Sequence, residues 1–241
     1  MTFEKKYFPI TCEVGFLEAD FDSVISMFKE WQEKICKSDQ ITFIVEELKS
    51  QFPNSLERLL PLTSLEGRRF VFIQTNSKWV AFFENGYPYP EIDSVVGYLA
   101  SKLKCRTIRA GWSENQFKKS ENIGSLGATI FTLYTPEVID VDNCKRSIQL
   151  INEGSSWRFY EYGEKLSFEK SVNYRKKKKE DRFNRQILAS YLSSFGLDFF
   201  DENFYSGKLI LIQKVGGELP SSKIYNLSEA QASLEFTPNW S

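Results

Sequence analysis

The fold is decided by residues 68–112, which read RRFVFIQTNSKWVAFFENGYPYPEIDSVVGYLASKLKCRTIRAGW. Two short apolar, β-branched and aromatic runs, residues 69–73 and 79–83, flank a polar turn of sequence Thr-Asn-Ser-Lys. Such a pair of runs predicts a β-hairpin. The second strand should end at Asn85-Gly86, because both residues readily adopt positive φ and the two prolines that follow lack the N–H that a ladder needs.

The period of the apolar residues changes after the hairpin. They recur at helical spacing at Ile92, Val95, Val96, Leu99 and Leu103. Acidic residues near the start and lysines near the end are typical of helix termini. Residues 105–108 read as another strand. We expect this strand–strand–helix–strand unit to bury the helix on one face of a sheet.

Similar patterns predict elements along the rest of the chain. Strands are expected at residues 7–17, 128–134, 146–151, 157–162, 166–168 and 209–215. A helix capped by Asp20 or Asp22 should follow the first strand, and another should cover residues 180–195, with Gly196 just past its end. Residues 41–51 fit either a strand or a helix, and residues 56–62 fit a short helix at most. Residues 113–127 and 136–143 are expected to be loops or turns.

These elements predict an α+β fold with antiparallel or mixed sheets, in which each half carries a hairpin and one well-signalled amphipathic helix. A chain of 241 residues suits a single domain, residues 1–241. The alternative is two subdomains, residues 1–122 and 123–217, followed by a polar tail at 218–241.

Composition limits the class of protein. Hydrophobic residues make up 41% and aromatic residues 15%, which is ample for a packed core. The net charge of −1 predicts no bulk attraction to nucleic acid or to an anionic membrane. No apolar run is long enough to span a bilayer, and the first residues lack the continuous apolar segment of a secretory signal. We therefore expect a cytoplasmic protein with no membrane partner.

Catalytic residues are scarce. The chain has no histidine, which excludes Ser-His-Asp and Cys-His catalysis and histidine-ligated zinc. The cysteines at 12, 36, 105 and 144 form no C-x-x-C pair, so buried free thiols are expected. No P-loop, G-x-G-x-x-G or G-x-S-x-G motif is present. We expect a protein that is not an enzyme, with no catalytic residues and no cofactor.

One pattern resembles a metal site. An Asp…Glu-x-Lys set on a strand can hold Mg²⁺ through two carboxylates while the lysine positions water, and Asp39, Glu47 and Lys49 provide these residues. The spacing from Asp39 is short, and the stretch also reads as a helix. Solvated charges are therefore the preferred interpretation, and no metal ligand is assigned.

Two basic stretches are candidates for a contact surface. The residues concerned are Lys102, Lys104, Arg106 and Arg109 in the first stretch, and Arg175, Lys176, Lys177, Lys178, Lys179, Arg182 and Arg185 in the second. They could form a solvated turn entering a helix, a face for an acidic protein partner, or a phosphate-binding patch. A third candidate is the acidic group Asp198, Asp201 and Glu202 among aromatic residues, for which a surface turn is preferred over a buried site of raised pKa.

Two segments carry a resemblance to a known group of proteins. The first is WVAFFENG at residues 79–86, followed by the helix and Cys105-Arg106. The second is WRFYEYG at residues 157–163, followed by Phe168-Glu169, Tyr174-Arg175, Asp181-Arg182-Phe183, Tyr191-Leu192 and Phe195-Gly196. Together, over residues 60–205, they resemble cytoplasmic bacterial immunity proteins encoded beside polymorphic toxins, of the type found in contact-dependent growth inhibition.

The resemblance implies a non-catalytic protein that binds a cognate toxin domain and blocks its active site or its activation. It assigns no binding residue. We therefore expect an immunity protein whose contact surface includes residues 102–109 and 175–185. The alternative is a nucleic-acid-binding protein or a metal-dependent nuclease that uses the same basic stretches.

Overall fold

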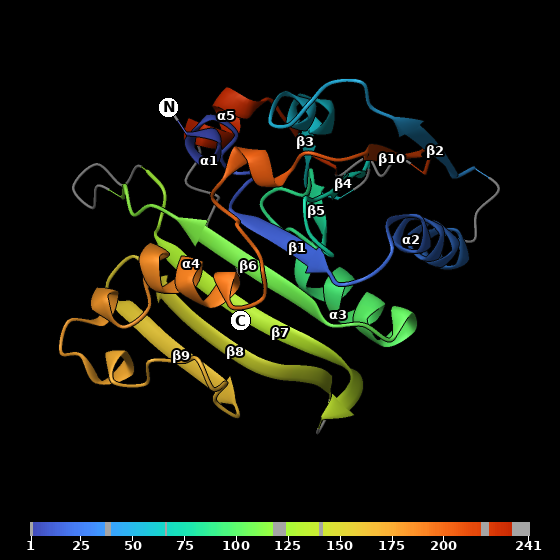
Figure 1. Ribbon diagram of the computed structural model, residues 1–241. Helices are drawn as coiled ribbons and strands as arrows, with labels where there is room; N and C mark the ends of the chain where they lie inside the picture. The colour runs from blue at the N-terminus through green and yellow to red at the C-terminus, as the bar shows by residue number, and fades with distance from the viewer. Residues whose placement is uncertain are drawn as a thin grey trace.

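The computed structural model describes residues 2–36, 40–65, 67–117, 124–139, 142–217 and 222–232. Its centre is a nine-stranded antiparallel sheet in the order β2-β10-β4-β5-β1-β6-β7-β8-β9 (Figure 1). The strands are β1 (Glu13–Leu17), β2 (Thr42–Glu47), β4 (Arg69–Gln74), β5 (Val80–Glu84), β6 (Thr107–Ser113), β7 (Ala128–Ile139), β8 (Asp142–Asn152), β9 (Trp157–Gly163) and β10 (Leu209–Val215). A second, two-stranded sheet pairs β3 (Leu62–Thr63) with β11 (Ile224–Tyr225).

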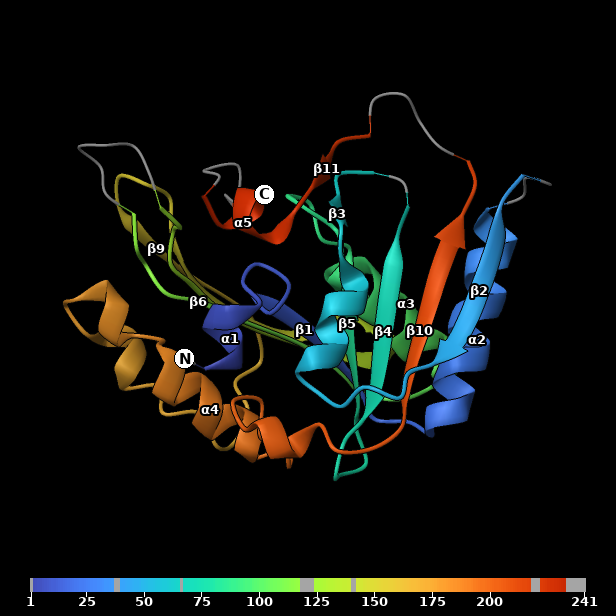
Figure 2. The same ribbon diagram turned by 90° about the horizontal axis from the view of Figure 1, so that it is seen from above.

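Helices cover both faces of the large sheet, as the two views in Figures 1 and 2 show. The α-helices are α1 (Phe3–Lys6), α2 (Phe21–Ile35), α3 (Ile92–Leu103), α4 (Arg185–Ser193) and α5 (Leu227–Ala232), and short 3₁₀ helices lie at Asn54–Leu59, Asn173–Arg175, Lys179–Asp181 and Glu202–Phe204. The fold is α+β, as the sequence predicts. None of the helices in the described part of the chain combines the length and apolar character needed to cross a membrane.

The predicted hairpin is confirmed as β4 and β5, which pair with Phe72 opposite Phe82. Both strands are buried on both faces. Phe70 and Phe72 point into the core beneath α2 and α3, whereas Val71 and Ile73 point into the core beneath α1 and α4. This explains why the two runs are continuously apolar instead of alternating with polar residues.

The predicted helix is confirmed as α3, and it is buried on one face of the sheet. Val95, Val96 and Leu99 are at most 1% exposed and pack with residues of β1 and β5. The strand after it, β6, does not lie beside the hairpin, because β1 is inserted between β5 and β6. Asp20 caps α2 by accepting a hydrogen bond from the Ser23 N–H at 2.9 Å.

Several predicted boundaries are wrong. The first strand begins only at Glu13, because residues 7–12 form turns after α1, and residues 166–168 are not a strand. The second long helix starts at Arg185, where Asn184 caps it by accepting from the Ile187 N–H at 3.1 Å. Residues 41–51, left open by the sequence, contain the edge strand β2.

The largest correction concerns residues 136–143. The turn-forming residues there predict a loop, yet β7 continues to Ile139 and β8 begins at Asp142. The pairing of β7 with β8 shifts register after Leu133 and again before Ile139. Such irregularities accommodate a proline within a paired strand, so tertiary pairing outweighs the local turn preference.

Candidate functional site

The second basic stretch lies in the connection between β9 and α4. Arg175, Lys176, Lys177 and Lys178 are all exposed there. Within the described chain, no ion pair involves any of these four side chains. We refer to residues 175–178 as the basic loop. It presents a concentrated positive charge to solvent.

A buried arginine anchors the chain just before the basic loop. Arg146 of β8 is 1% exposed. Its Nε and Nη2 donate to the two carboxylate oxygens of Glu169 at 2.9 and 2.8 Å, and Nη2 also donates to Glu161 at 2.7 Å. Nη1 donates to the carbonyls of Tyr162 and Gly163 at 3.1 and 2.9 Å. All five N–H donors of the guanidinium are thus satisfied within the protein.

Two tyrosines extend this network to the loop. The Tyr174 hydroxyl donates to Glu169 at 2.8 Å and lies 2.9 Å from the Tyr191 hydroxyl, which accepts from the Lys170 N–H at 3.1 Å. Since each hydroxyl has one proton, Tyr191 donates to Tyr174. Burial, together with the hydrogen bonds to Tyr191 and Glu169, raises the pKa of Tyr174. The chain of bonds therefore joins α4, residues 169–174 and β8 in one rigid unit.

Gly163 makes the sharp end of β9 possible. Its φ is +81°, a conformation that L side chains rarely adopt, and a Cβ at this position would lie 2.1 Å from the Lys145 carbonyl oxygen. Glycine is therefore required where the chain leaves β9 and its carbonyl turns toward Arg146.

Contacts after the basic loop fix its other end. Lys179 Nζ donates to the Trp157 carbonyl of β9 at 2.9 Å. Arg182 Nε donates to the Lys176 carbonyl at 2.8 Å, and its guanidinium lies 5.9 Å from the centroid of the Phe159 ring. Lys179 and Arg182 therefore hold the loop in place, whereas residues 175–178 remain available to a partner.

Arg185 has a structural role as well. Its Nη2 lies 2.6 Å from Glu4 Oε1, and its guanidinium stacks 3.7 Å from the centroid of the Phe200 ring. The ion pair ties the start of α4 to α1, and the ring contact ties it to Phe200.

The first basic stretch is divided between surface and core. Lys102 and Lys104 are exposed at the end of α3. Arg106 forms a two-pronged ion pair with Glu18, at 2.5 and 2.9 Å. Arg109 is 9% exposed and its guanidinium contacts Glu13 and Asp93 at 2.5 and 3.0 Å, so it presents no charge at the surface.

Arg185 of the second stretch and Arg106 of the first lie at opposite ends of α4. Arg185 begins α4, whereas Arg106 lies 5.6 Å from the ring centroid of Phe195, just beyond the other end of that helix. A nine-residue helix is about 13 Å long. Of the two stretches, the basic loop has four consecutive exposed cationic residues, and we take it as the candidate site.

The metal-site pattern finds no support in the described residues. Glu47 and Lys49 are exposed at the end of β2, and Asp39 lies outside the described residues. No group of three or more Cys, Asp or Glu residues in the described ranges could hold a metal ion. In the acidic group, Asp198, Asp201 and Glu202 are exposed around buried aromatic residues, as the interpretation as a surface turn expects.

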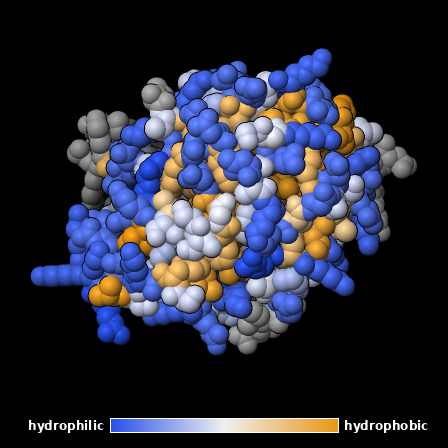
Figure 3. Space-filling model, in the orientation of Figure 1, coloured by the Kyte–Doolittle hydropathy of each residue, from blue (hydrophilic) through white to orange (hydrophobic). Residues whose placement is uncertain are grey.

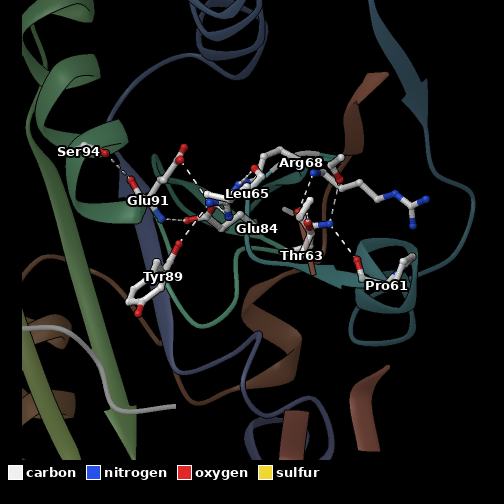
Figure 4. A network of polar contacts seen from close by, with 12 residues as sticks. Pro61, Thr63, Leu65, Arg68, Glu84, Tyr89, Glu91 and Ser94 are labelled. Carbon is white, nitrogen blue, oxygen red and sulfur yellow. Dashed lines mark hydrogen bonds and ion pairs between the residues drawn. The ribbon is translucent and has the colours of Figure 1, made fainter. Parts of the chain in front are cut away.

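The sequence did not predict a network of charged residues that lies beside α3 (Figure 4). Arg68 contacts Glu84 at 3.4 Å and Glu91 at 3.3 Å, and Glu84 also accepts a hydrogen bond from the Glu91 backbone N–H. Burial raises the pKa of Glu84 to about 7, although the nearby Arg68 opposes this shift. The network fastens the Tyr-Pro-Tyr-Pro segment between β5 and α3.

The cysteines agree with the sequence prediction in being free. Cys12 and Cys144 are buried, and Cys36 and Cys105 are half-buried. Burial raises the pKa of Cys105 to about 11, so its thiol is not activated as a nucleophile.

Comparisons with protein-family models, with curated proteins and with solved structures found no match for this chain.

Proposed function

We propose that this chain is a non-catalytic binding protein that acts in the bacterial cytoplasm and neutralises a toxin by direct protein–protein contact. In this proposal the basic loop meets an acidic surface of the toxin. The observation that supports it is the run of four exposed cationic side chains, residues 175–178, placed between two anchored segments.

Anchoring favours binding. A loop that is already ordered loses less conformational entropy on association than a mobile one. The Arg146 network fixes the chain before the basic loop, and the bond from Lys179 to the Trp157 carbonyl fixes it afterwards. Clustered exposed charge also steers an oppositely charged partner and raises the association rate.

Several residues of the second segment that carries the resemblance to immunity proteins lie beside this surface. Gly163, Glu169, Tyr174 and Tyr191 belong to the anchoring network, and Phe183 is fully buried beside it. A shared frame that displays a variable charged loop suits a class of proteins in which each member recognises its own toxin.

The proposal is tested by capturing the tagged protein from its native host, with nuclease treatment of the lysate and mass spectrometry of what is retained. We expect one stoichiometric protein partner that survives nuclease and moderate salt. Binding that disappears with nuclease, or that is lost at ~0.2 M salt, would indicate nucleic acid instead and would contradict the proposal.

A further inference from the structure

The other end of the sheet is formed by β2, which is open. β2 pairs with β10 on one side, and no strand of the described chain lies on its other side. Ile44 and Val45 are 53% and 41% exposed, although they lie in the middle of the strand. Figure 3 shows hydrophobic residues at the surface in this region, at its upper right. An open edge with apolar side chains is a template for pairing with another strand.

The hydrogen bonds to β10 indicate which backbone groups of β2 face outward. The Leu48 N–H donates to the Leu209 carbonyl at 2.9 Å. Because the bonding direction alternates along an antiparallel strand, Ile44 and Glu46 also bond toward β10. Phe43, Val45 and Glu47 therefore direct their N–H and C=O groups away from the sheet.

We propose that β2 pairs with β2 of a second copy of this chain, antiparallel, around a two-fold axis that passes through Ile44 perpendicular to the sheet. This register sets Ile44 opposite Ile44, Phe43 opposite Val45, and Thr42 opposite Glu46. Apolar residues thus meet apolar residues, and no carboxylate faces a carboxylate.

Symmetry and backbone geometry favour this register. An axis through Val45 would set Ile44 opposite Glu46, which is a poorer match. With the axis through Ile44, the outward-facing Phe43 and Val45 become opposite residues, and each such pair exchanges both backbone hydrogen bonds. The dimer has a continuous sheet, and its two basic loops lie at opposite ends.

A single pair of strands forms a small interface, so association should be weak and should depend on concentration. Sedimentation equilibrium of the full chain over a range of concentrations measures this directly. We expect a monomer–dimer equilibrium for the natural sequence. A chain that stays monomeric throughout the range would overturn the proposal.

Charge substitutions at the axis test the register itself. Ile44→Lys and Ile44→Asp each place like charges directly opposite one another, so each variant alone should be monomeric. An equimolar mixture of the two should dimerise again, because Lys then faces Asp. The control Ile224→Lys alters another exposed isoleucine, 68% exposed on β11, and should dimerise like the natural chain.

Three outcomes would contradict the proposed interface: either Ile44 variant alone still dimerises, the mixture stays monomeric, or Ile224→Lys abolishes the dimer. Circular dichroism of each variant verifies that the substituted chain is folded.

Discussion

The two edge strands of the sheet, β9 and β2, differ in how the rest of the chain covers them. The edge at β9 is partly covered by its own chain, since Lys179 bonds to the Trp157 carbonyl and the rings of Phe159 and Tyr174 lie 5.2 Å apart. In the described structure no strand lies beyond β2; Phe43 packs against the core beside α2 and Glu46 pairs with Arg58 at 2.7 Å, but Ile44 and Val45 are exposed. Beside β9 a buried polar network supports a run of exposed cationic residues, whereas β2 exposes Ile44 and Val45.

This difference shows how one sheet can carry two kinds of surface. Buried polar groups that are fully bonded specify a single arrangement of the chain around them. An exposed strand is held by its one neighbour and tolerates changes at the surface. Substitutions in the buried polar network beside β9 should therefore affect stability strongly, and those at β2 should affect association.

The largest effect is expected from the buried ion pair of Arg146 with Glu169. Arg146→Met leaves the carboxylate of Glu169, whose side chain is 0% exposed, without its cation. Removing one partner of a buried pair costs about 3–5 kcal/mol. Urea denaturation should show this loss of unfolding free energy.

The matched control is Arg158→Met on β9, where the side chain is 54% exposed and pairs with Glu153. It should cost less than about 1 kcal/mol. Equal losses in the two variants would show that the Arg146 network does not secure this edge.

The next largest effect on stability is expected from Glu84 of β5, a strand in the interior of the sheet. The pKa of Glu84 is raised from 4.5 to about 7, so the native state keeps a proton that the unfolded chain has already lost. The unfolding free energy should therefore fall by about 3 kcal/mol between pH 4.5 and 7 and level off above that range. Denaturation at a series of pH values measures the slope, and no histidine titrates in this window.

Glu84→Gln should remove most of this slope, whereas Glu46→Gln at the open edge should leave it unchanged. A slope that persists in Glu84→Gln would mean that another group is responsible for it.

A smaller effect on stability is expected from the Tyr174 hydroxyl in the network beside β9. Tyr174→Phe removes the bond to Glu169 and leaves the Tyr191 hydroxyl without its acceptor. The loss should be about 1–3 kcal/mol. The control Tyr160→Phe alters a tyrosine of β9 that is 48% exposed, and thermal unfolding should detect little change. If Tyr160→Phe proves as costly, the hydroxyl network is not the source of stability.

The smallest effect is expected at the open edge. Ile44→Thr should change the unfolding free energy of the monomer by no more than about 0.5 kcal/mol, because the side chain is exposed. Ile212→Thr, at a residue of β10 that is 0% exposed, should cost more. Both are measured at a concentration at which the chain is monomeric. A large loss at Ile44 would mean that β2 is not an open edge.

Local patterns in the sequence predicted the elements that local chemistry controls. The hairpin, α3 and β10 follow from apolar periodicity and turn residues, and Asp20 was one of two residues expected to cap α2. The order of strands could not be predicted, because the insertion of β1 between β5 and β6 and of β10 between β2 and β4 depends on contacts distant in sequence. The strand residues 136–139 and 142–143 were missed for the same reason.

The candidate site was predicted in part. Charge density alone identified residues 175–178, but it also selected Arg109, which is buried, and Arg185, which is committed to Glu4. A cationic residue in the sequence does not reveal whether a carboxylate from another strand lies beside it. The partners of Arg109, Glu13 and Asp93, come from β1 and α3, respectively, and only the fold brings the three together.

The most direct measurement is the affinity of the captured partner for two charge-reversed variants, by titration calorimetry. Lys176→Glu/Lys177→Glu alters the basic loop, and Lys102→Glu/Lys104→Glu makes the same charge change on exposed residues at the end of α3. We expect the loop variant to bind about tenfold to a hundredfold more weakly, which is about 1.4–2.8 kcal/mol, with the control close to the natural chain. Equal affinities for the two variants would contradict the assignment of the basic loop as the contact surface.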